Sequence, residues 1–248
     1  MKRCCFFLLL GLGLVSLLGC GPTATALPTA VSPTPAASTT APPTPDLLAR
    51  PAMTVQGQLA SGVPYGVTGD GGCFQGDPQA PVMILEFSDF QCPYCARYVR
   101  ETFPQIQENF IASGKVVYVF RHFPLSGHPQ AQIAAEAVEC AGRQGQFWPM
   151  HDHVFLNQAE WSGQNNALSV LLGYGAQLGL DRAAYQTCLG EHQTAQKVRQ
   201  DYAFGQSIQV PSTPAFLIIG RSVQGLVGAQ PYANFAQAIE SALAALNP

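Results

Sequence analysis

Residues 85–95 read LEFSDFQCPYC, an apolar run that ends in two cysteines, Cys92 and Cys95, with two residues between them. The run begins earlier, at Pro81, and is short, continuous and rich in β-favouring side chains, which is typical of a buried strand. From Cys92 to Phe110 the apolar residues recur at helical spacing instead. The stretch therefore predicts a strand that hands over to a helix at Cys92.

A cysteine at the start of a helix is suited to thiol chemistry. Only the thiolate is a nucleophile, and the unpaired N–H groups and positive dipole end of a helix favour the anion. The spacing of three residues puts Cys95 one turn further along the same face, close enough to form a disulfide with Cys92. We expect Cys92 to be the exposed attacker and Cys95 the shielded resolving thiol. Pro93 suits the first helical turn, where its missing N–H costs nothing.

The order of the other elements predicts an α/β fold. A second strand over Lys115–Phe120 completes a βαβ unit, whose two strands are parallel. Pro104 predicts a kink or early end in the intervening helix. Residues 129–207 are helical in pattern throughout, and strand character returns at Ala215–Ile219 and continues through Val227 before a final helix over Pro231–Leu246. We expect a small mixed sheet with a helical insertion between a βαβ half and a ββα half.

The amino-terminal region predicts export and a membrane anchor. Lys2 and Arg3 precede an apolar block that is too short to span a bilayer, which fits a signal peptide over residues 1–19. The block ends in Leu-Leu-Gly-Cys, which resembles the bacterial lipobox, so Cys20 is the expected lipidation site. The alternative is an ordinary signal peptide with a chance cysteine. Residues 20–50 are rich in Pro, Thr and Ala and predict a disordered tether, followed by one domain over residues 51–248.

Four separated motifs resemble the DsbA-like branch of the thioredoxin superfamily, in its exported single-domain form with a helical insertion. They are EFSDFQCPYC, RHFPL, ECAGRQGQFWPMHD and PSTPAFLI, in the family's order. The resemblance covers about Gly76 to Leu246. It implies a thioredoxin-like fold in which Cys92 and Cys95 are the redox pair. It also implies that Thr213-Pro214 is a cis peptide that faces this pair and binds the substrate backbone, whereas sequence alone favours a trans turn.

Glu86 lies within the first predicted strand, and two interpretations are open. It is either a solvated carboxylate on an edge strand or a buried carboxyl beneath the cysteines that accepts the resolving thiol's proton. An acid occupies a similar place in thioredoxin-like proteins, which favours the second interpretation. For His122 and His128, after the second predicted strand, we expect capping or surface roles.

The remaining cysteines suggest one further bridge. Cys140 and Cys188 lie on two predicted helices of the insertion; in a reducing compartment they would be two small core residues, but in an exported protein we expect a structural disulfide, as in related family members. Cys73 is left over, either as a buried thiol in a strand that enters the core or as a reactive site.

Other classes of function are less consistent with the sequence. No basic run suggests nucleic acid. A Cys-x-x-Cys pair is half of a zinc site, but His151 and His153 are two residues apart on a predicted helix and point to different faces, so we expect no metal. A lipid-anchored peptide-binding module or holdase without turnover is the alternative of another class, and the intact cysteine pair argues against it.

We expect a monomeric thiol:disulfide oxidoreductase that donates the Cys92–Cys95 disulfide to reduced exported proteins. Isomerase and reductase are the alternatives within the fold, since all three use the same mixed disulfide. The expected partners are these substrate proteins and a quinone-linked membrane reoxidase of the DsbB or VKOR type. No cofactor beyond the redox-active disulfide is expected. The expected location is the periplasmic or extracellular side of a membrane.

Overall fold

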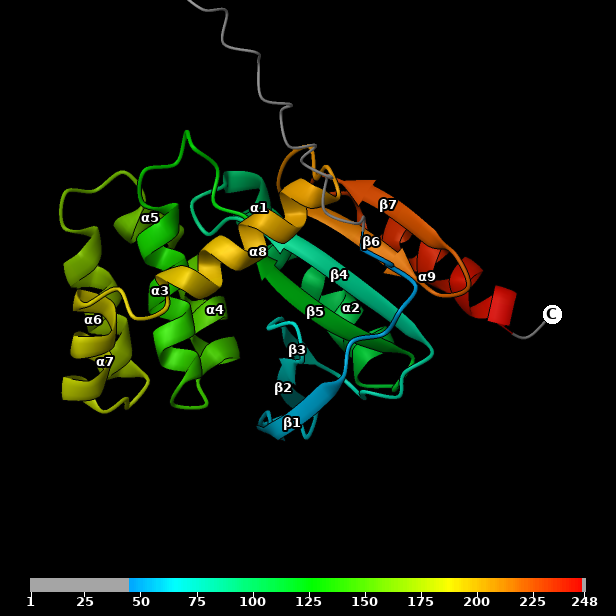
Figure 1. Cartoon of the computed structure of the whole chain (residues 1–248), viewed down its shortest axis with the longest axis horizontal. Coiled ribbons are helices and arrows are strands. Elements are labelled where there is room, and N and C mark those ends of the chain that lie inside the picture. Colours follow the sequence, from blue (N-terminus) through cyan, green and yellow to red (C-terminus); the bar gives the residue numbers. More distant parts are fainter. Residues whose placement is uncertain (1–44, 247–248) are drawn as a thin grey trace, which may run out of the picture. The chain divides into compact units, whose positions relative to one another are not determined.

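The computed structural model describes residues 45–246, so the predicted signal peptide, the lipidation site Cys20 and most of the predicted tether lie outside the described residues. Seven strands form one sheet in the order β1-β2-β3-β5-β4-β6-β7 (Figure 1). The neighbours β4 and β5 run parallel, and the other neighbouring pairs of this sheet are antiparallel. The strands are β1 (Met53–Gln58), β2 (Pro64–Thr68), β3 (Cys73–Gln75), β4 (Val82–Ser88), β5 (Val116–His122), β6 (Ala215–Ile219) and β7 (Val223–Val227).

The βαβ unit is built as the sequence predicts. All residues of β4 and β5 are buried, which agrees with their continuous apolar runs and with coverage on both faces. The helix between them is interrupted at Thr102, two residues before Pro104, because proline cannot continue the hydrogen-bond ladder. It consists of α1 (Pro93–Glu101), α2 (Phe103–Ile106) and one π-helical segment, η1 (Gln107–Ile111).

The helical insertion between β5 and β6 is also confirmed. Asp181 accepts a hydrogen bond from the Ala184 amide at 2.8 Å and so caps α7. Figure 1 shows α3 to α7 gathered beside one end of the sheet, while α8 returns across it. The helices are α3 (Ala131–Gly142), α4 (Phe147–Leu156), α5 (Gln158–Trp161), α6 (Ala167–Gln177), α7 (Arg182–Gly190) and α8 (Ala195–Ser207).

Each face of the sheet carries its own apolar cluster, because side chains alternate along the strands. Ile84 and Phe120 belong to the face that packs on α1, α3, α4 and the final helix α9 (Tyr232–Leu246). Leu85 and Phe87 belong to the opposite face, which α8 covers with Phe204. Glu86 and Ser88 share the first face with Ile84, so two polar side chains enter the larger core.

Strands β1 and β2 are a correction, since the sequence predicts no strand before the one that was an open alternative at Cys73. These strands are short, and β1 is largely exposed, so they lack the apolar signal of β4 and β5. They form by pairing, with β3 docked antiparallel on β5. Gly62 and Gly71 lie in the turns that join them and have φ angles of 82° and 97°, a conformation that favours glycine. None of the helices in residues 45–246 has the length and hydropathy of a membrane span.

Candidate active site

Cys92 caps the amino end of α1. Its backbone is extended, with φ −72° and ψ 123°, and Pro93 is the first residue of the helix. The Cys92 carbonyl accepts the Ala96 amide at 3.2 Å, which starts the helical ladder. The sulfur is therefore placed where the free N–H groups of the first turn point, as the sequence predicts.

The exposure of Cys92 is a correction. We expected an exposed attacker, but Cys92 is only 3% exposed. The loop before β6 covers it, since its sulfur lies 3.5 Å from the carbonyl oxygen of Thr213. Tyr94, two residues further on, is 56% exposed, so the entry to the pair lies at the Pro93-Tyr94 side.

The two thiols differ in electrostatics. The Cys95 thiol, by hydrogen bonding, lowers the pKa of Cys92 to about 6; burial opposes this shift, while Thr213 and the amides of Tyr94 and Cys95 add to it. Burial raises the pKa of Cys95 well above its ordinary value, and the neighbouring Cys92 adds to the rise. Both are free thiols here. At neutral pH the arrangement favours a Cys92 thiolate beside a protonated Cys95 thiol.

The peptide bond between Thr213 and Pro214 is cis. It lies directly before β6, so the backbone of Thr213 is presented beside Cys92 rather than paired within the sheet. Thr213 is 5% exposed. The sequence-predicted substrate-binding pair is therefore brought to the cysteine that we expect to react.

Glu86 is buried beneath the pair at 1% exposure, in a central strand rather than at an edge. The hydroxyl of Tyr118 donates a hydrogen bond of 2.6 Å to its Oε2 atom. Burial raises the pKa of this carboxyl, although the charge of His151 and hydrogen bonding from Tyr118 oppose the rise. Ser88, two residues on, lies close enough to both Glu86 and Cys95 to lower the pKa of each, yet its hydroxyl makes no hydrogen bond of normal geometry.

The loop between β4 and α1 is held by side chains from the helical insertion. Gln158 of α5 donates its side-chain amide to the carbonyl oxygens of Phe90 at 2.7 Å and Cys92 at 3.0 Å. The carboxylate of Asp89 accepts the Gln91 amide at 2.7 Å and contacts His128 Nδ1 at 2.6 Å. The insertion thus fixes the backbone that presents Cys92.

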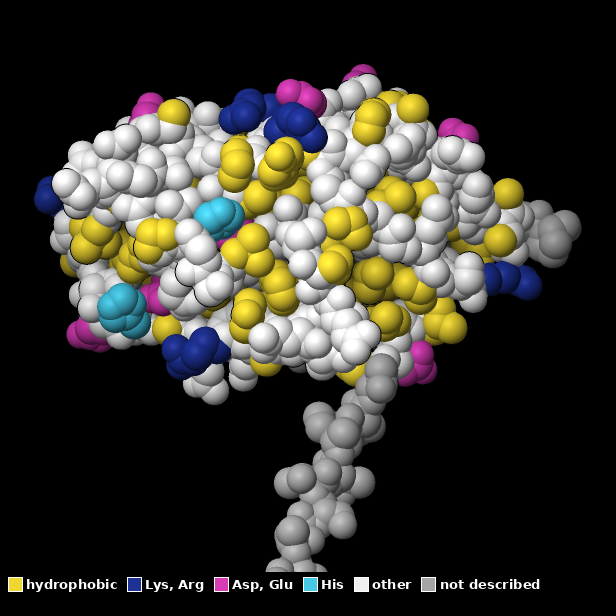
Figure 2. Space-filling model, turned by 90° about the horizontal axis from the view of Figure 1, so that it is seen from above, with side chains coloured by type: hydrophobic (Ala, Val, Ile, Leu, Met, Phe, Trp, Pro, Cys, Tyr) yellow, Lys and Arg dark blue, Asp and Glu magenta, His cyan; other side chains and the backbone are white. Residues whose placement is uncertain are grey.

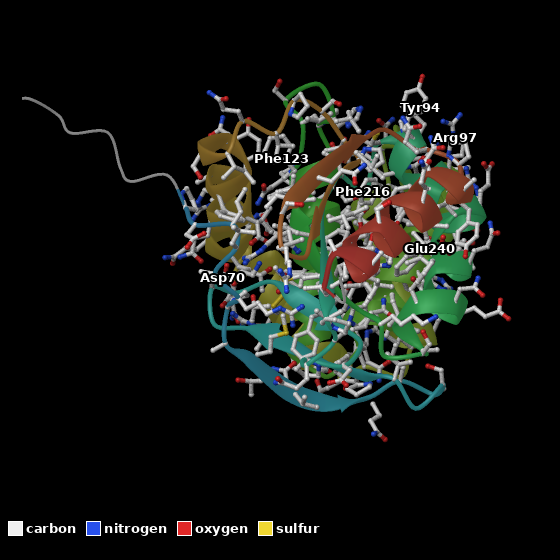
Figure 3. All side chains as sticks on the ribbon, turned by 90° about the vertical axis from the view of Figure 1, so that its right-hand side faces the viewer. Asp70, Tyr94, Arg97, Phe123, Phe216 and Glu240 are labelled. Carbon is white, nitrogen blue, oxygen red and sulfur yellow. A yellow bond between two sulfur atoms is a disulfide. The ribbon has the colours of Figure 1, made fainter. Side chains whose placement is uncertain are left out.

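The surface around the exposed end of α1 is partly apolar. Tyr94 and Arg97 project outward (Figure 3), with the guanidinium 5.2 Å from the centre of the tyrosine ring. In the face seen in Figure 2, hydrophobic side chains form a broad band and charged ones lie mainly towards the rim.

The other predicted cysteines lie away from this pair. Cys140 of α3 and Cys188 of α7 are joined by a disulfide. Cys73 begins β3, is 6% exposed, and its thiol lies 3.9 Å from Glu139 Oε1; burial raises its pKa well above the ordinary value. It is therefore a buried thiol in a core strand.

The predicted surface or capping role of His122 is corrected to burial in an ion-pair network. Its ring is 1% exposed and its Nε2 lies 2.8 Å from Glu139. These two residues and Asp201 offer ligand atoms within 4.8 Å of one another. However, Arg121 pairs with Asp201 at 2.9 Å, and Lys197 pairs with both carboxylates, so side-chain cations already balance the cluster.

Several site residues were not found from the sequence. Ser88 and Gln158 reach the cysteine pair, and Tyr118 reaches Glu86, only through strand register and helix packing, for which the sequence carries no local signal. His151 lies in the WPMHD motif, and in the sequence it suggests only a metal ligand. Its buried position follows from the apolar spacing of α4.

Comparisons with known proteins identify the fold. Residues 68–241, more than half of the chain, match the family described as Thioredoxin. The structure of Wolbachia pipientis alpha-DsbA1 is 25% identical with a TM-score of 0.61 and covers 68% of this chain and 89% of that one. Oxidised BdbD from Bacillus subtilis is 24% identical with a TM-score of 0.62, covering 68% and 91%.

Curated relatives carry a different name. The Na(+)/H(+) antiporter NhaA 1 of Salinispora arenicola is 37% identical over 152 residues, 61% of this chain and 22% of that protein. The NhaA of Herminiimonas arsenicoxydans is 33% identical over 151 residues, 61% and 23%. This chain spans less than a quarter of the length of these relatives, so their named ion transport is not carried over to it. From the family match and the solved structures, the chain belongs to the thioredoxin family and has the DsbA-like form of its fold.

Proposed function

We propose that this thiol:disulfide oxidoreductase acts as an oxidase that forms disulfides in reduced exported proteins. The observation that carries the proposal is the pairing of a Cys92 thiol of lowered pKa with a buried Cys95 thiol, beside the cis Thr213-Pro214 peptide. A stabilised thiolate favours the reduced form of the pair and makes its disulfide a stronger oxidant. The DsbA-like fold supports the same direction.

In the proposed reaction, a substrate thiolate attacks the Cys92 sulfur of the oxidised pair. The Cys92–Cys95 bond breaks, and Cys95 takes the electron pair and a proton. A second substrate thiolate then attacks the first substrate sulfur, which closes the substrate disulfide and releases Cys92 as thiolate. Its lowered pKa makes Cys92 the better leaving group of the two. The reaction needs no cofactor beyond the disulfide.

The test is disulfide transfer from the oxidised protein to a reduced, unfolded protein with two cysteines. Transfer should be lost in Cys92→Ser and retained in Cys73→Ser, which removes a buried free thiol outside the site. The redox potential of the Cys92–Cys95 pair distinguishes an oxidase from a reductase. An oxidase requires a value well above the roughly −270 mV of thioredoxin, whereas a value that low supports a reductase. Stable binding of unfolded protein with no transfer would support the holdase alternative.

Export and lipid anchoring at Cys20 belong to the same proposal and rest on the sequence of residues 1–20. The chain would then act as a monomer on the periplasmic or extracellular side, with a quinone-linked reoxidase of the DsbB or VKOR type restoring the disulfide. Cys20→Ala should move the protein from the membrane fraction to the soluble fraction. Continued membrane association of that variant would contradict the anchor.

A further inference from the structure

His151 is a fully buried histidine that the reaction above does not use. It lies in α4 at 0% exposure, and its Nδ1 is 2.8 Å from Asp152 Oδ1. Its Nε2 has no hydrogen-bond partner among residues 45–246. Buried polar atoms are nearly always partnered, so such an atom calls for an explanation. Aromatic rings surround the imidazole: Phe90, Phe103, Phe120, Phe147, Trp148 and Phe155.

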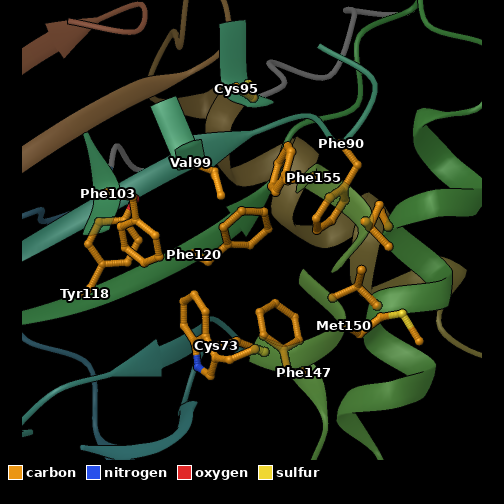
Figure 4. Packing of buried hydrophobic residues seen from close by; sticks show 14 of the residues in the cluster. Cys73, Phe90, Cys95, Val99, Phe103, Tyr118, Phe120, Phe147, Met150 and Phe155 are labelled. Carbon is orange, nitrogen blue, oxygen red and sulfur yellow. The ribbon is translucent and has the colours of Figure 1, made fainter. Parts of the chain in front are cut away.

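Two more unpartnered buried atoms lie on the same face of the sheet, Glu86 Oε1 and Ser88 Oγ. In the parallel register of β4 and β5, Glu86 is opposite Phe120. The His151 ring stands perpendicular to the ring of Phe120 with 5.0 Å between their centres. Figure 4 shows Phe120 in the middle of this aromatic core, with Cys95 at one end of the view. Glu86, Ser88 and His151 therefore converge beneath the cysteine pair.

The groups near Glu86 are two tyrosine hydroxyls, the Ser88 hydroxyl with the Cys95 thiol beyond it, and the His151 imidazole. Tyr118 donates to the carboxyl, and Tyr98 lies 3.0 Å from the Tyr118 hydroxyl. Burial raises the pKa of both phenols well above the ordinary value, so they remain protonated and serve as hydrogen-bond donors. Cys95 is reached through Ser88. His151 is the remaining neighbour, and histidine is the side chain that ordinarily changes charge between pH 5 and 8.

His151 is related to both the buried carboxyl and the surface. Its imidazole acts on Glu86 through its charge, which lowers the pKa of the carboxyl. Its other nitrogen contacts Asp152, whose side chain is 46% exposed. Ser88, Glu86 and His151 each leave one polar atom unpartnered on the side of the sheet that carries Cys95, and the imidazole contacts Asp152 at the surface.

We propose that His151 is the positioning residue of the Cys95 step: it holds Glu86 in the state that exchanges a proton with Cys95, and passes that proton through Asp152 to solvent. The proposal rests on the proposed function. When Cys95 attacks a mixed disulfide at Cys92, the Cys92–Cys95 bond forms and the outer sulfur leaves as thiolate. The Cys95 proton passes to the Ser88 hydroxyl, which gives its own proton to Glu86. In the oxidising direction the same protons return to Cys95.

The test measures the attack of Cys92 and the attack of Cys95 as two separate steps. The disulfide substrate is 5,5′-dithiobis(2-nitrobenzoate), which releases coloured thionitrobenzoate. The reduced protein releases a first thionitrobenzoate when Cys92 attacks, and a second when Cys95 attacks the mixed disulfide. Stopped-flow absorbance records both phases between pH 5 and 9. The variants are His151→Gln, Asp152→Asn and Glu86→Gln. The matched control is His153→Gln, which makes the same change on the same helix, at a ring that packs on Tyr174 instead.

For His151→Gln we expect the profile of the second phase to move up by about one pH unit, which is about tenfold in rate on its rising limb. The reason is that Glu86 loses the charge that lowers its pKa and is a base over less of the range. Asp152→Asn should shift the profile in the same direction by less, since it changes the side chain that contacts the His151 imidazole at 2.8 Å. His153→Gln should match the wild type. The first phase should stay within about twofold in all these variants.

The double variant Glu86→Gln/His151→Gln decides whether His151 acts through Glu86. We expect it to be no slower than Glu86→Gln alone. A His151→Gln profile that overlies the wild type, or a further slowing in the double variant, would overturn the proposal. Because Asp152 is half exposed, Asp152→Asn tests it even if the buried variants do not fold, and an unshifted profile there counts against it. Loss of the first phase in wild-type protein would instead reject the proposed function.

Discussion

The sulfur of Cys92 lies 3.5 Å from the carbonyl oxygen of Thr213, although 121 residues separate them in the chain. The contact joins the start of α1 to the loop before β6, which are adjacent because β4 and β6 pair in the centre of the sheet. It explains why a reactive cysteine at a helix start is nonetheless covered. It also places the backbone of Thr213, the proposed substrate-binding residue, beside the sulfur of Cys92.

Thr213→Val tests the contribution of the threonine side chain to the thiolate. The residue lowers the pKa of Cys92, and its hydroxyl is the part that valine lacks. We expect the pKa of Cys92 to rise above its value of about 6 and the disulfide to become less oxidising. Thiolate absorbance against pH measures the first effect, and equilibration with glutathione measures the second. An unchanged pKa would show that backbone groups and Cys95 suffice.

Gln158→Ala tests whether the helical insertion fixes the Cys92 loop. Removing two hydrogen bonds to carbonyl oxygens should lower the free energy of unfolding by about 1–2 kcal/mol. The reaction of Cys92 should also slow, since its backbone is less restrained. Urea denaturation and the rate of thiol modification measure the two effects. The control is Gln164→Ala, an exposed glutamine in the loop after α5; equal losses in both variants would contradict the assignment.

The disulfide between Cys140 and Cys188 should stabilise the insertion. Its cysteines are 48 residues apart, so replacing both with serine should cost about 2–4 kcal/mol of unfolding free energy. Disulfide transfer by Cys92 should persist at temperatures where the variant is folded. The bridge joins α3 to α7 and lies away from the Cys92–Cys95 pair, so its loss should not change the reacting groups. Thermal unfolding and the transfer assay check both statements. A variant that is folded but inactive would show that the bridge shapes the site.

Glu86→Gln should change how stability depends on pH. Burial raises the pKa of Glu86 in the folded protein above its unfolded value of about 4.3. The folded state then holds this proton more tightly, so its contribution is complete below pH 4.3 and is lost as pH rises through the folded pKa. Wild-type stability should therefore fall relative to Glu86→Gln between pH 5 and 8. Urea denaturation of both proteins at pH 5 and at pH 8 measures this. If the difference in unfolding free energy between wild type and Glu86→Gln is the same at both pH values, Glu86 ionises as readily as in water.

Strong local patterns made much of the fold predictable. The continuous apolar runs of β4 and β5, the turn from strand to helix at Cys92 and the interruption near Pro104 all depend on neighbouring residues. Strands β1 and β2 were not predicted, because β1 is largely exposed and neither strand has the continuous apolar run of β4 and β5. β3 has only three residues and is stabilised by pairing with β2 and β5.

The site was less predictable than the fold. The cysteine spacing indicates the chemistry, but the exposure of Cys92 depends on the Thr213 loop, which the local sequence does not reveal. Gln158 and His151 have ordinary helical surroundings in the sequence, and only tertiary packing brings them beneath or beside the pair. The roles assigned to Cys92, Cys95 and Glu86 remain predictions.

The central claim is that Cys92 is a thiolate at neutral pH while Cys95 is not, and the ultraviolet absorbance of the reduced protein against pH tests it most directly. We predict one thiolate transition with a midpoint near 6 that disappears in Cys92→Ser. Cys95 should not titrate near neutral pH, because burial raises its pKa. A first transition near the ordinary thiol value of 9.0, or a transition near 6 that survives in Cys92→Ser, would contradict the account.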